Sequence, residues 1–111
     1  MAYICAMKII ETPVFTKKIN DLLTNEEYRN LQNELILNPE KGKIIRGSGG
    51  LRKIRFGKTG HGKNGGVRVI YYWILRKETI LMLLVYPKNE QDNLSSSQLK
   101  LLRSLVEKEL Q

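Results

Sequence analysis

The sequence predicts one α+β domain over residues 1–111, with two N-terminal helices, an antiparallel sheet of three to four strands and a C-terminal helix. Three observations indicate this class. Apolar residues recur at helical spacing in the first third of the chain and again at its end, whereas the middle alternates with the period of a strand. A length of 111 residues suits a single domain, and 41% hydrophobic with 27% charged residues is typical of a globular chain.

Two helices are predicted in the first third of the chain. Thr12 and Pro13 have the pattern of an N-cap followed by proline in the first turn. Thr24 and Glu27 have the spacing of a capping box, which predicts the start of a second helix. The Asn-Pro pair at 38–39 is expected to end that helix.

Four segments have strand character. They cover residues 8–11, 51–57, 67–75 and 79–86. The last is apolar on both faces, which predicts a central strand covered on both sides. The polar residues 76–78 are expected to form a tight hairpin connection.

The final segment is predicted to be a helix. Ser95 and Gln98 form another capping-box pattern at its start. Its apolar positions fall on one face: Leu99, Leu102, Leu105 and Val106.

Positive charge is concentrated in the middle of the chain. The net charge is +8, and eleven of the nineteen Lys and Arg residues lie between residues 41 and 77, where there is no Asp or Glu. Cations without acidic neighbours attract a polyanion, and the phosphate backbone of a nucleic acid is the most common one. Membrane headgroups are a weaker alternative, because no basic amphipathic helix carries these charges. A merely solvated basic surface is the simplest alternative.

Two cations share one face of the predicted strand at 51–57. Because side chains alternate along a strand, Lys53 and Arg55 point to one side with Leu51, whereas Arg52 points to the other. Two like charges side by side repel each other unless an anion lies between them, which favours a function for this pair. Arg68 in the next strand is a further candidate, with the alternative that it only reaches solvent from a sheet edge.

A glycine-rich loop joins these two strands. Half of residues 57–66 are glycine, and the loop also carries Lys58, Lys63 and the only histidine, His61. Glycine lets backbone N–H groups approach phosphates closely, so Lys58 and Lys63 are predicted to bind RNA, as Arg52 is. The alternative is a hairpin loop kept soluble by its lysines. His61 is a minor candidate for acid–base catalysis, because the ordinary pKa of histidine lies near neutrality.

The end of the last predicted strand gathers a phenol, a cation and polar groups. Tyr86 is followed by Pro87, which ends the ladder, and then by Lys88 and Asn89. We expect Tyr86 to take part in catalysis and Lys88 and Asn89 to contact RNA. An ordinary strand-to-helix turn is the alternative.

Several chemistries are missing from the sequence. Zinc-ligand spacings, a Ser-His-Asp set and a dinucleotide fingerprint are all absent, so we expect no metal and no cofactor. Cys5 is the only cysteine, which excludes an internal disulfide, and we assign it no catalytic role. No apolar run approaches a membrane span and the first residues do not resemble a secretion signal, so the expected compartment is the cytoplasm.

RNA cleavage by this chain is expected to be metal-independent, because the basic segment has no paired carboxylates. The natural route uses the 2′-hydroxyl of the RNA as the nucleophile. Lys53, Arg55 and Arg68 would then stabilise the negatively charged phosphorane. Like-charge crowding lowers the pKa of a lysine, so a lysine in this set is a candidate for proton transfer.

Three segments together resemble the RelE/ParE superfamily of bacterial toxins, and in particular its HigB-type branch. They are Gly-Gly-Leu-Arg-Lys-Ile-Arg at 49–55, Gly-Gly-Val-Arg-Val-Ile-Tyr-Tyr at 65–72 and Tyr-Pro-Lys-Asn-Glu at 86–90. The resemblance implies the fold of a RelE-like microbial ribonuclease. It also implies a ribosome-dependent endoribonuclease that cuts mRNA in the A site, stops translation and is neutralised by a cognate antitoxin of helix-turn-helix type.

The resemblance also assigns residues. Lys53 and Arg55 match the basic pair on the second strand of the family pattern, Arg68 matches the arginine of the third, and Lys88 matches the basic position after the last strand. The chain departs from the pattern at Asn89, where an arginine is typical. It also lacks the tyrosine that usually begins the terminal helix, near residue 95 here, for which Tyr86, Tyr72 or His61 would have to substitute.

Two alternatives from other functional classes stay open. The first is a ParE-like toxin that inhibits DNA gyrase, since one fold supports both activities. The second is a basic RNA-binding module without catalysis, although no recognition helix or aromatic RNA-binding pattern supports it.

Overall fold

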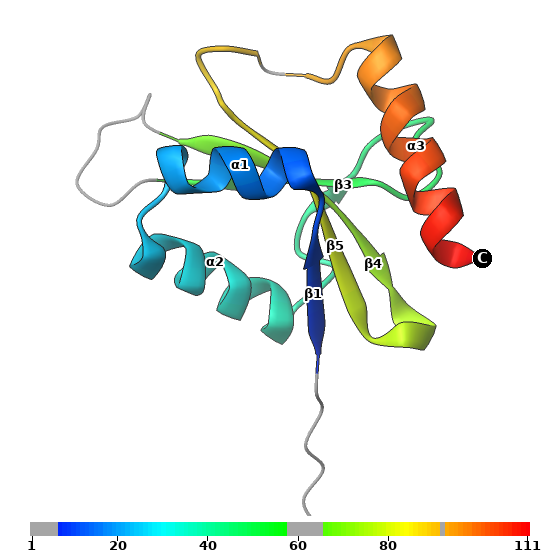
Figure 1. The fold of residues 1–111 in the computed structure, drawn as a ribbon, viewed down its shortest axis with the longest axis horizontal. Helices are drawn as coiled ribbons and strands as arrows, with labels where there is room; N and C mark the ends of the chain where they lie inside the picture. The colour runs from blue at the N-terminus through cyan, green and yellow to red at the C-terminus, as the bar shows by residue number, and fades with distance from the viewer. Residues whose placement is uncertain (1–6, 58–65, 92) are drawn as a thin grey trace, which may run out of the picture.

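A computed structural model of the chain describes residues 7–57, 66–91 and 93–111, which form a five-stranded sheet with helices on both faces (Figure 1). The strands are β1 (Lys8–Glu11), β2 (Lys43–Ile44), β3 (Arg52–Phe56), β4 (Val67–Ile74) and β5 (Thr79–Pro87). The helices are α1 (Pro13–Leu22), α2 (Asn25–Leu37) and α3 (Ser96–Leu110), and a 3₁₀ turn, η1 (Leu75–Lys77), joins β4 to β5. The predicted α+β class is confirmed.

Each α-helix begins at the cap that the sequence predicts. The Thr12 hydroxyl accepts a hydrogen bond from a backbone N–H in the first turn of α1. Thr24 and Glu27 form a complete capping box at the start of α2, and Ser95 with Gln98 forms one at the start of α3. These side chains satisfy backbone N–H groups that have no partner within the helix.

The sheet has one strand more than the sequence predicts, and it is mixed rather than wholly antiparallel. Its order is β1-β5-β4-β3-β2, and β1 pairs with β5 in parallel while the other pairs are antiparallel. The additional strand, β2, has two residues and pairs only with β3. It places Lys43 directly opposite Lys53.

The central strand β5 is covered on both faces, as predicted, and carries a β-bulge. Every residue from 79 to 86 is buried. Ile70 of β4 pairs with Leu84, whereas the next residue, Tyr71, pairs with Met82, so Leu83 is an extra residue in β5. A bulge of this kind bends the strand and increases its twist.

Two apolar clusters fix which face each strand residue occupies. α1 and α2 pack on one face, against residues that include Ile54, Val69, Tyr71, Ile80 and Met82. α3 packs on the other face, against residues that include Leu51, Ile70, Leu81, Leu83, Leu84 and Tyr86. In β3, Ile54 therefore faces α1 and α2, and its neighbours Lys53 and Arg55 face the α3 side.

No helix among the described residues is both long enough and apolar enough to cross a membrane.

Candidate functional site

Four cations lie in two opposite pairs on the α3 side of the sheet. Arg55 of β3 is directly opposite Arg68 of β4, and Lys53 of β3 is directly opposite Lys43 of β2. Opposite residues in an antiparallel pair project to the same face with Cα atoms about 4.5–5.5 Å apart. We call Lys43, Lys53, Arg55 and Arg68 the cation cluster. Tyr86 of β5 is opposite Arg68 and so continues the row of Arg55 and Arg68.

Tyr86 and the members of the cation cluster differ in burial. Arg55 is exposed and Lys53 is half-buried, whereas the exposed fraction is 4% for Arg68 and 1% for Tyr86. Arg68 lies on a strand flanked by β3 and β5, so the alternative that it reaches solvent from a sheet edge does not describe it. The Lys53 ammonium donates a hydrogen bond to the Asn93 side-chain carbonyl at 3.0 Å. Solvent therefore meets Lys43, Lys53 and Arg55, with Arg68 and Tyr86 behind them.

The stability of the sheet does not explain this arrangement. Like charges directly opposite each other on neighbouring strands are destabilising, and the cation cluster contains two such pairs. A phosphate placed over the exposed part of the cluster would reduce that repulsion.

A cavity lies beside the exposed part of the cluster. Its volume is about 380 Å³, and its lining includes Lys41, Lys43, Lys53 and Arg55. Lys41 forms an ion pair with Glu34 of α2 at 3.2 Å. Within residues 7–57, 66–91 and 93–111, no group of three or more His, Cys, Asp or Glu side chains could hold a metal ion.

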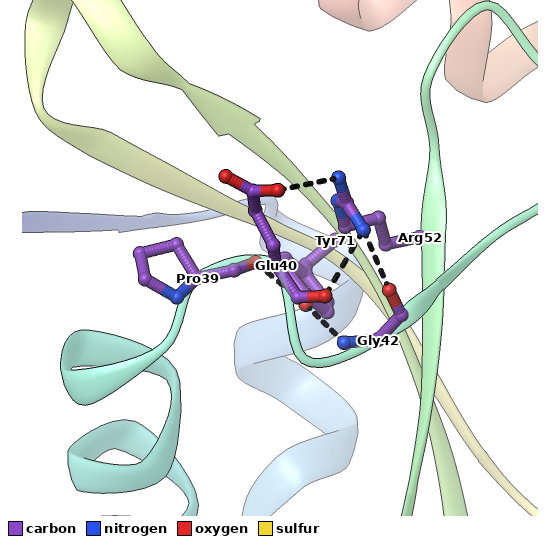
Figure 2. Close-up of polar contacts among 5 residues, drawn as sticks. All are labelled: Pro39, Glu40, Gly42, Arg52 and Tyr71. Carbon is purple, nitrogen blue, oxygen red and sulfur yellow. Dashed lines mark hydrogen bonds and ion pairs between the residues drawn. The ribbon is translucent and has the colours of Figure 1, made fainter.

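Arg52 lies on the opposite face and holds a turn (Figure 2). Its guanidinium donates hydrogen bonds to the backbone carbonyls of Glu40 and Gly42, at 3.1 and 2.8 Å. The buried Tyr71 hydroxyl accepts from the Gly42 N–H and donates to the Pro39 carbonyl, both at 2.8 Å. Burial raises the pKa of Tyr71, so this hydroxyl keeps its proton. Arg52 is thus not brought together with Lys53 and Arg55; it anchors the turn that leads into β2.

Other cations of the basic segment also serve the fold. Arg76 and Lys77, in η1, donate hydrogen bonds to the backbone carbonyls of Leu110 and Glu109 at 2.8 and 2.7 Å. Carbonyls in the last turn of a helix have no partner within it, so these contacts tie the end of α3 to the β4–β5 connection. Among the described residues of the positive segment, Arg52, Arg76 and Lys77 therefore hold the fold, whereas four others form the cluster.

The remaining predicted site residues lie near the same end of the sheet or outside the described residues. Lys88 and Asn89 are exposed in the turn after β5, and the Lys88 N–H donates to the Gly66 carbonyl at 3.2 Å. Cys5, Lys58, His61 and Lys63 lie outside the described residues. Lys43 was missed by the sequence analysis, because a two-residue strand carries no periodic pattern.

The fold and the cation cluster define a small, basic α+β protein with a row of cations across one face of its sheet. Residues 7–111 match the family described as "RelE toxin of RelE / RelB toxin-antitoxin system". The chain belongs to this RelE toxin family. It is therefore the toxin of a type II toxin–antitoxin system and an mRNA endoribonuclease, with an antitoxin as its partner.

Solved structures of E. coli RelE share the fold. The intact RelBE toxin–antitoxin complex contains a chain with a TM-score of 0.58 and 21% identity, covering 74% of this chain and 96% of that one. A RelE variant with two arginine-to-alanine substitutions, in the free state, matches with a TM-score of 0.59 and 18% identity, covering 78% of this chain and 88% of that one. The isolated RelE toxin matches with a TM-score of 0.57 and 17% identity, covering 90% of this chain and 99% of that one. The RelE/ParE resemblance is thus confirmed, while these matches do not single out the HigB-type branch.

Proposed function

We propose that this toxin cleaves mRNA in the ribosomal A site by binding the scissile phosphate over Lys53 and Arg55, with the charge of Arg68 directly behind. The observation that carries the proposal is the register of β3 and β4, which sets Arg55 opposite Arg68, with Lys53 two residues away on the same face of β3. Lys53 and Arg55 are accessible to a ligand, whereas Arg68 acts from a buried position. Charge held in a partly buried site is screened less by salt than charge on an open surface.

The proposed reaction is a transesterification within the RNA. The 2′-oxygen attacks the neighbouring phosphorus, its proton passes to a base, and the bond to the 5′-oxygen breaks as that oxygen gains a proton. The products are a 2′,3′-cyclic phosphate and a 5′-hydroxyl, and no metal ion is required. Negative charge grows on the phosphorane oxygens, so fixed cations stabilise the transition state more than the ground state.

The proton-transfer residues remain predictions. Tyr86 lies opposite Arg68, but only 1% of it is exposed. Its hydroxyl therefore reaches RNA only if the residues that cover it move. His61 lies outside the described residues, and it retains the pKa argument that made it a candidate. Tyr72 is half-buried on β4 and pairs with Leu81, well along the strand from Arg68, so it is a weaker substitute.

We further propose that the exposed polar residues around the cluster bind the RNA backbone or ribosomal RNA. Lys88 and Asn89 have the exposure this role needs, and Lys58 and Lys63 are the glycine-rich loop's candidates. We propose the cytoplasm as the compartment, because that is where translating ribosomes are found. A helix-turn-helix antitoxin remains the proposed form of the partner.

The test is cleavage mapping on ribosomes programmed with a defined mRNA. A Lys53→Ala/Arg55→Ala variant is preferable to one that also changes Arg68, because truncating a buried arginine leaves a cavity. We expect this double variant to lose cleavage by a factor of at least about 100, the size typical of one transition-state contact. Lys17→Ala, which removes one exposed charge from α1, is the control and should cleave like the wild type.

Each alternative predicts a different result. Undiminished cleavage by a folded Lys53→Ala/Arg55→Ala variant would show that the site is elsewhere. DNA damage without broken messages would indicate a gyrase inhibitor. Salt-dependent RNA binding without any cleavage, even on ribosomes, would indicate a binding module.

A further inference from the structure

The cation cluster extends one strand beyond the residues that the proposed cleavage uses. Lys43 is exposed on β2, directly opposite Lys53, at the wall of the cavity of about 380 Å³. That volume lies in the range of small-ligand pockets, about 300–1,000 Å³. The cleavage chemistry above needs Lys53, Arg55 and Arg68, and it gives no role to Lys43.

The turn before β2 fixes the backbone at Lys43. Arg52 and Tyr71 together make four hydrogen bonds to backbone groups of residues 39–42, so the residue immediately before Lys43 is held to the sheet (Figure 2). A Cβ added at Gly42 would lie 2.8 Å from the Tyr71 ring, which shows how closely the turn approaches the strand. This anchoring presents Lys43 on the same face as Lys53 at a defined register position.

The spacing of the cations suits consecutive phosphates. Neighbouring strands are about 4.8 Å apart and alternate residues of a strand about 6.8 Å apart, which places the Cα atoms of Arg55 and Lys43 roughly 8 Å apart. Lysine and arginine side chains are long enough to adjust that separation to the distance between successive phosphates of an extended strand. A basic groove that follows the backbone is the usual way of binding single-stranded RNA.

Two carboxylates near the turn before β2 pair with cations other than Lys43. Glu34 pairs with Lys41 at 3.2 Å, and Glu40 lies 3.8 Å from the Arg52 guanidinium. Lys41 therefore adds little net charge to the cavity, and the exposed Lys43 is among its other lining residues.

We propose that Lys43 forms a second phosphate subsite, which binds the phosphate next to the scissile one in the single-stranded message. The proposal rests on the proposed function, because it takes the scissile phosphate to lie over Lys53 and Arg55. The cavity beside Lys43 receives the backbone as it leaves the cleaved bond, so the subsite holds the message in register for the reaction. A lysine on a short edge strand also discourages pairing with another chain, and the experiment must separate the two roles.

The test combines a protein variant with a neutralised substrate. Ribosomes are programmed with mRNAs in which one phosphate, on either side of the mapped cleavage position, is replaced by an uncharged methylphosphonate. Wild type, Lys43→Ala, Lys43→Arg and the charge-matched control Lys17→Ala are compared by kcat/KM. We expect Lys43→Ala to lose about threefold to tenfold on the natural message, as for one partly exposed charge-assisted contact, and Lys43→Arg to retain activity.

The decisive measurement is the activity of Lys43→Ala on the methylphosphonate message. If Lys43 binds the neighbouring phosphate, methylphosphonate at one of the two positions lowers wild-type kcat/KM by a similar factor, and Lys43→Ala adds no further loss on that substrate. Independent, multiplying losses would overturn the proposal, as would a Lys43→Ala variant that aggregates but cleaves normally. Failure of the proposed function looks different: either the wild type would not cleave the message at all, or Lys53→Ala/Arg55→Ala would cleave it undiminished.

Discussion

Arg52 and Arg55 are three residues apart on β3, and the structure predicts opposite consequences for their removal. Arg52 donates two hydrogen bonds to backbone carbonyls of the α2–β2 turn and keeps only 17% of its side chain exposed. Its ion pair with the largely exposed Glu40, at 3.8 Å, contributes little. Losing two charge-assisted hydrogen bonds should cost Arg52→Ala about 2–3 kcal/mol, or roughly 8–12 °C in Tm.

Arg55→Ala should behave in the reverse way. The side chain is exposed and opposite another cation, so its removal should change the free energy of unfolding by no more than about 0.5 kcal/mol. The proposed site places Arg55 against the phosphorane, so cleavage should fall roughly 100-fold. Circular dichroism melts give Tm, and primer extension on programmed ribosomes gives the cleavage rate at a temperature where both variants are folded.

One result would refute this division of roles between Arg52 and Arg55. If Arg52→Ala, fully folded at the assay temperature, loses cleavage as severely as Arg55→Ala does, then the two faces of β3 do not have separate roles. A large fall in Tm for Arg55→Ala would contradict the same argument from the other direction.

Two further predictions concern stability. Burial raises the pKa of both Tyr28 and Tyr71 above the ordinary 10.0, and Tyr28 also donates a hydrogen bond to Glu11. The unfolded chain therefore loses these protons first, so the free energy of unfolding is unaffected below pH 10 and falls above it, by up to about 1.4 kcal/mol per pH unit for each tyrosine. Urea unfolding from pH 9 to 11 measures the slope; a Tyr28→Phe/Tyr71→Phe variant with an unchanged slope would contradict the assignment. Separately, Arg76→Ala/Lys77→Ala should cost about 1 kcal/mol and speed amide hydrogen exchange in the last turn of α3, whereas unaltered exchange there would mean that these exposed contacts do not hold the helix end.

The sequence predicts those elements whose signals are local. Each helix start depends on a side chain and a backbone N–H no more than three residues away, as for Thr12, Thr24 and Ser95. The strands β3, β4 and β5 were predicted because their apolar residues follow a pattern that is continuous along the chain. Such contacts need no knowledge of the tertiary structure.

The missed features depend on contacts between distant segments. The parallel pairing of β1 with β5 joins Lys8 to Thr79, and nothing near either residue specifies the direction of its partner. β2 is a strand only because β3 lies beside it, and two residues are too few to show a period.

The same distinction applies to the site. Alternation along β3 correctly places Lys53 and Arg55 on one face, opposite to Arg52, but it does not reveal what each side chain meets. The register that sets Arg55 against Arg68, and the burial of Arg68, come from strand pairing across the glycine-rich loop. The carbonyl partners of Arg52 belong to a turn ten or more residues earlier, so the sequence alone suggested an RNA contact instead.

The extra residue in β5 shows where this fold can tolerate changes in length. Leu83 is accommodated because apolar side chains are covered on both faces of β5, so a residue displaced from one face still finds an apolar environment on the other. β3 has no such freedom, because its two faces carry different chemistry. One inserted residue there would turn Lys53 and Arg55 toward the apolar layer under α1 and α2 and leave Ile54 in their place. Variation in strand length is thus compatible with an active toxin in β5 and incompatible with it in β3.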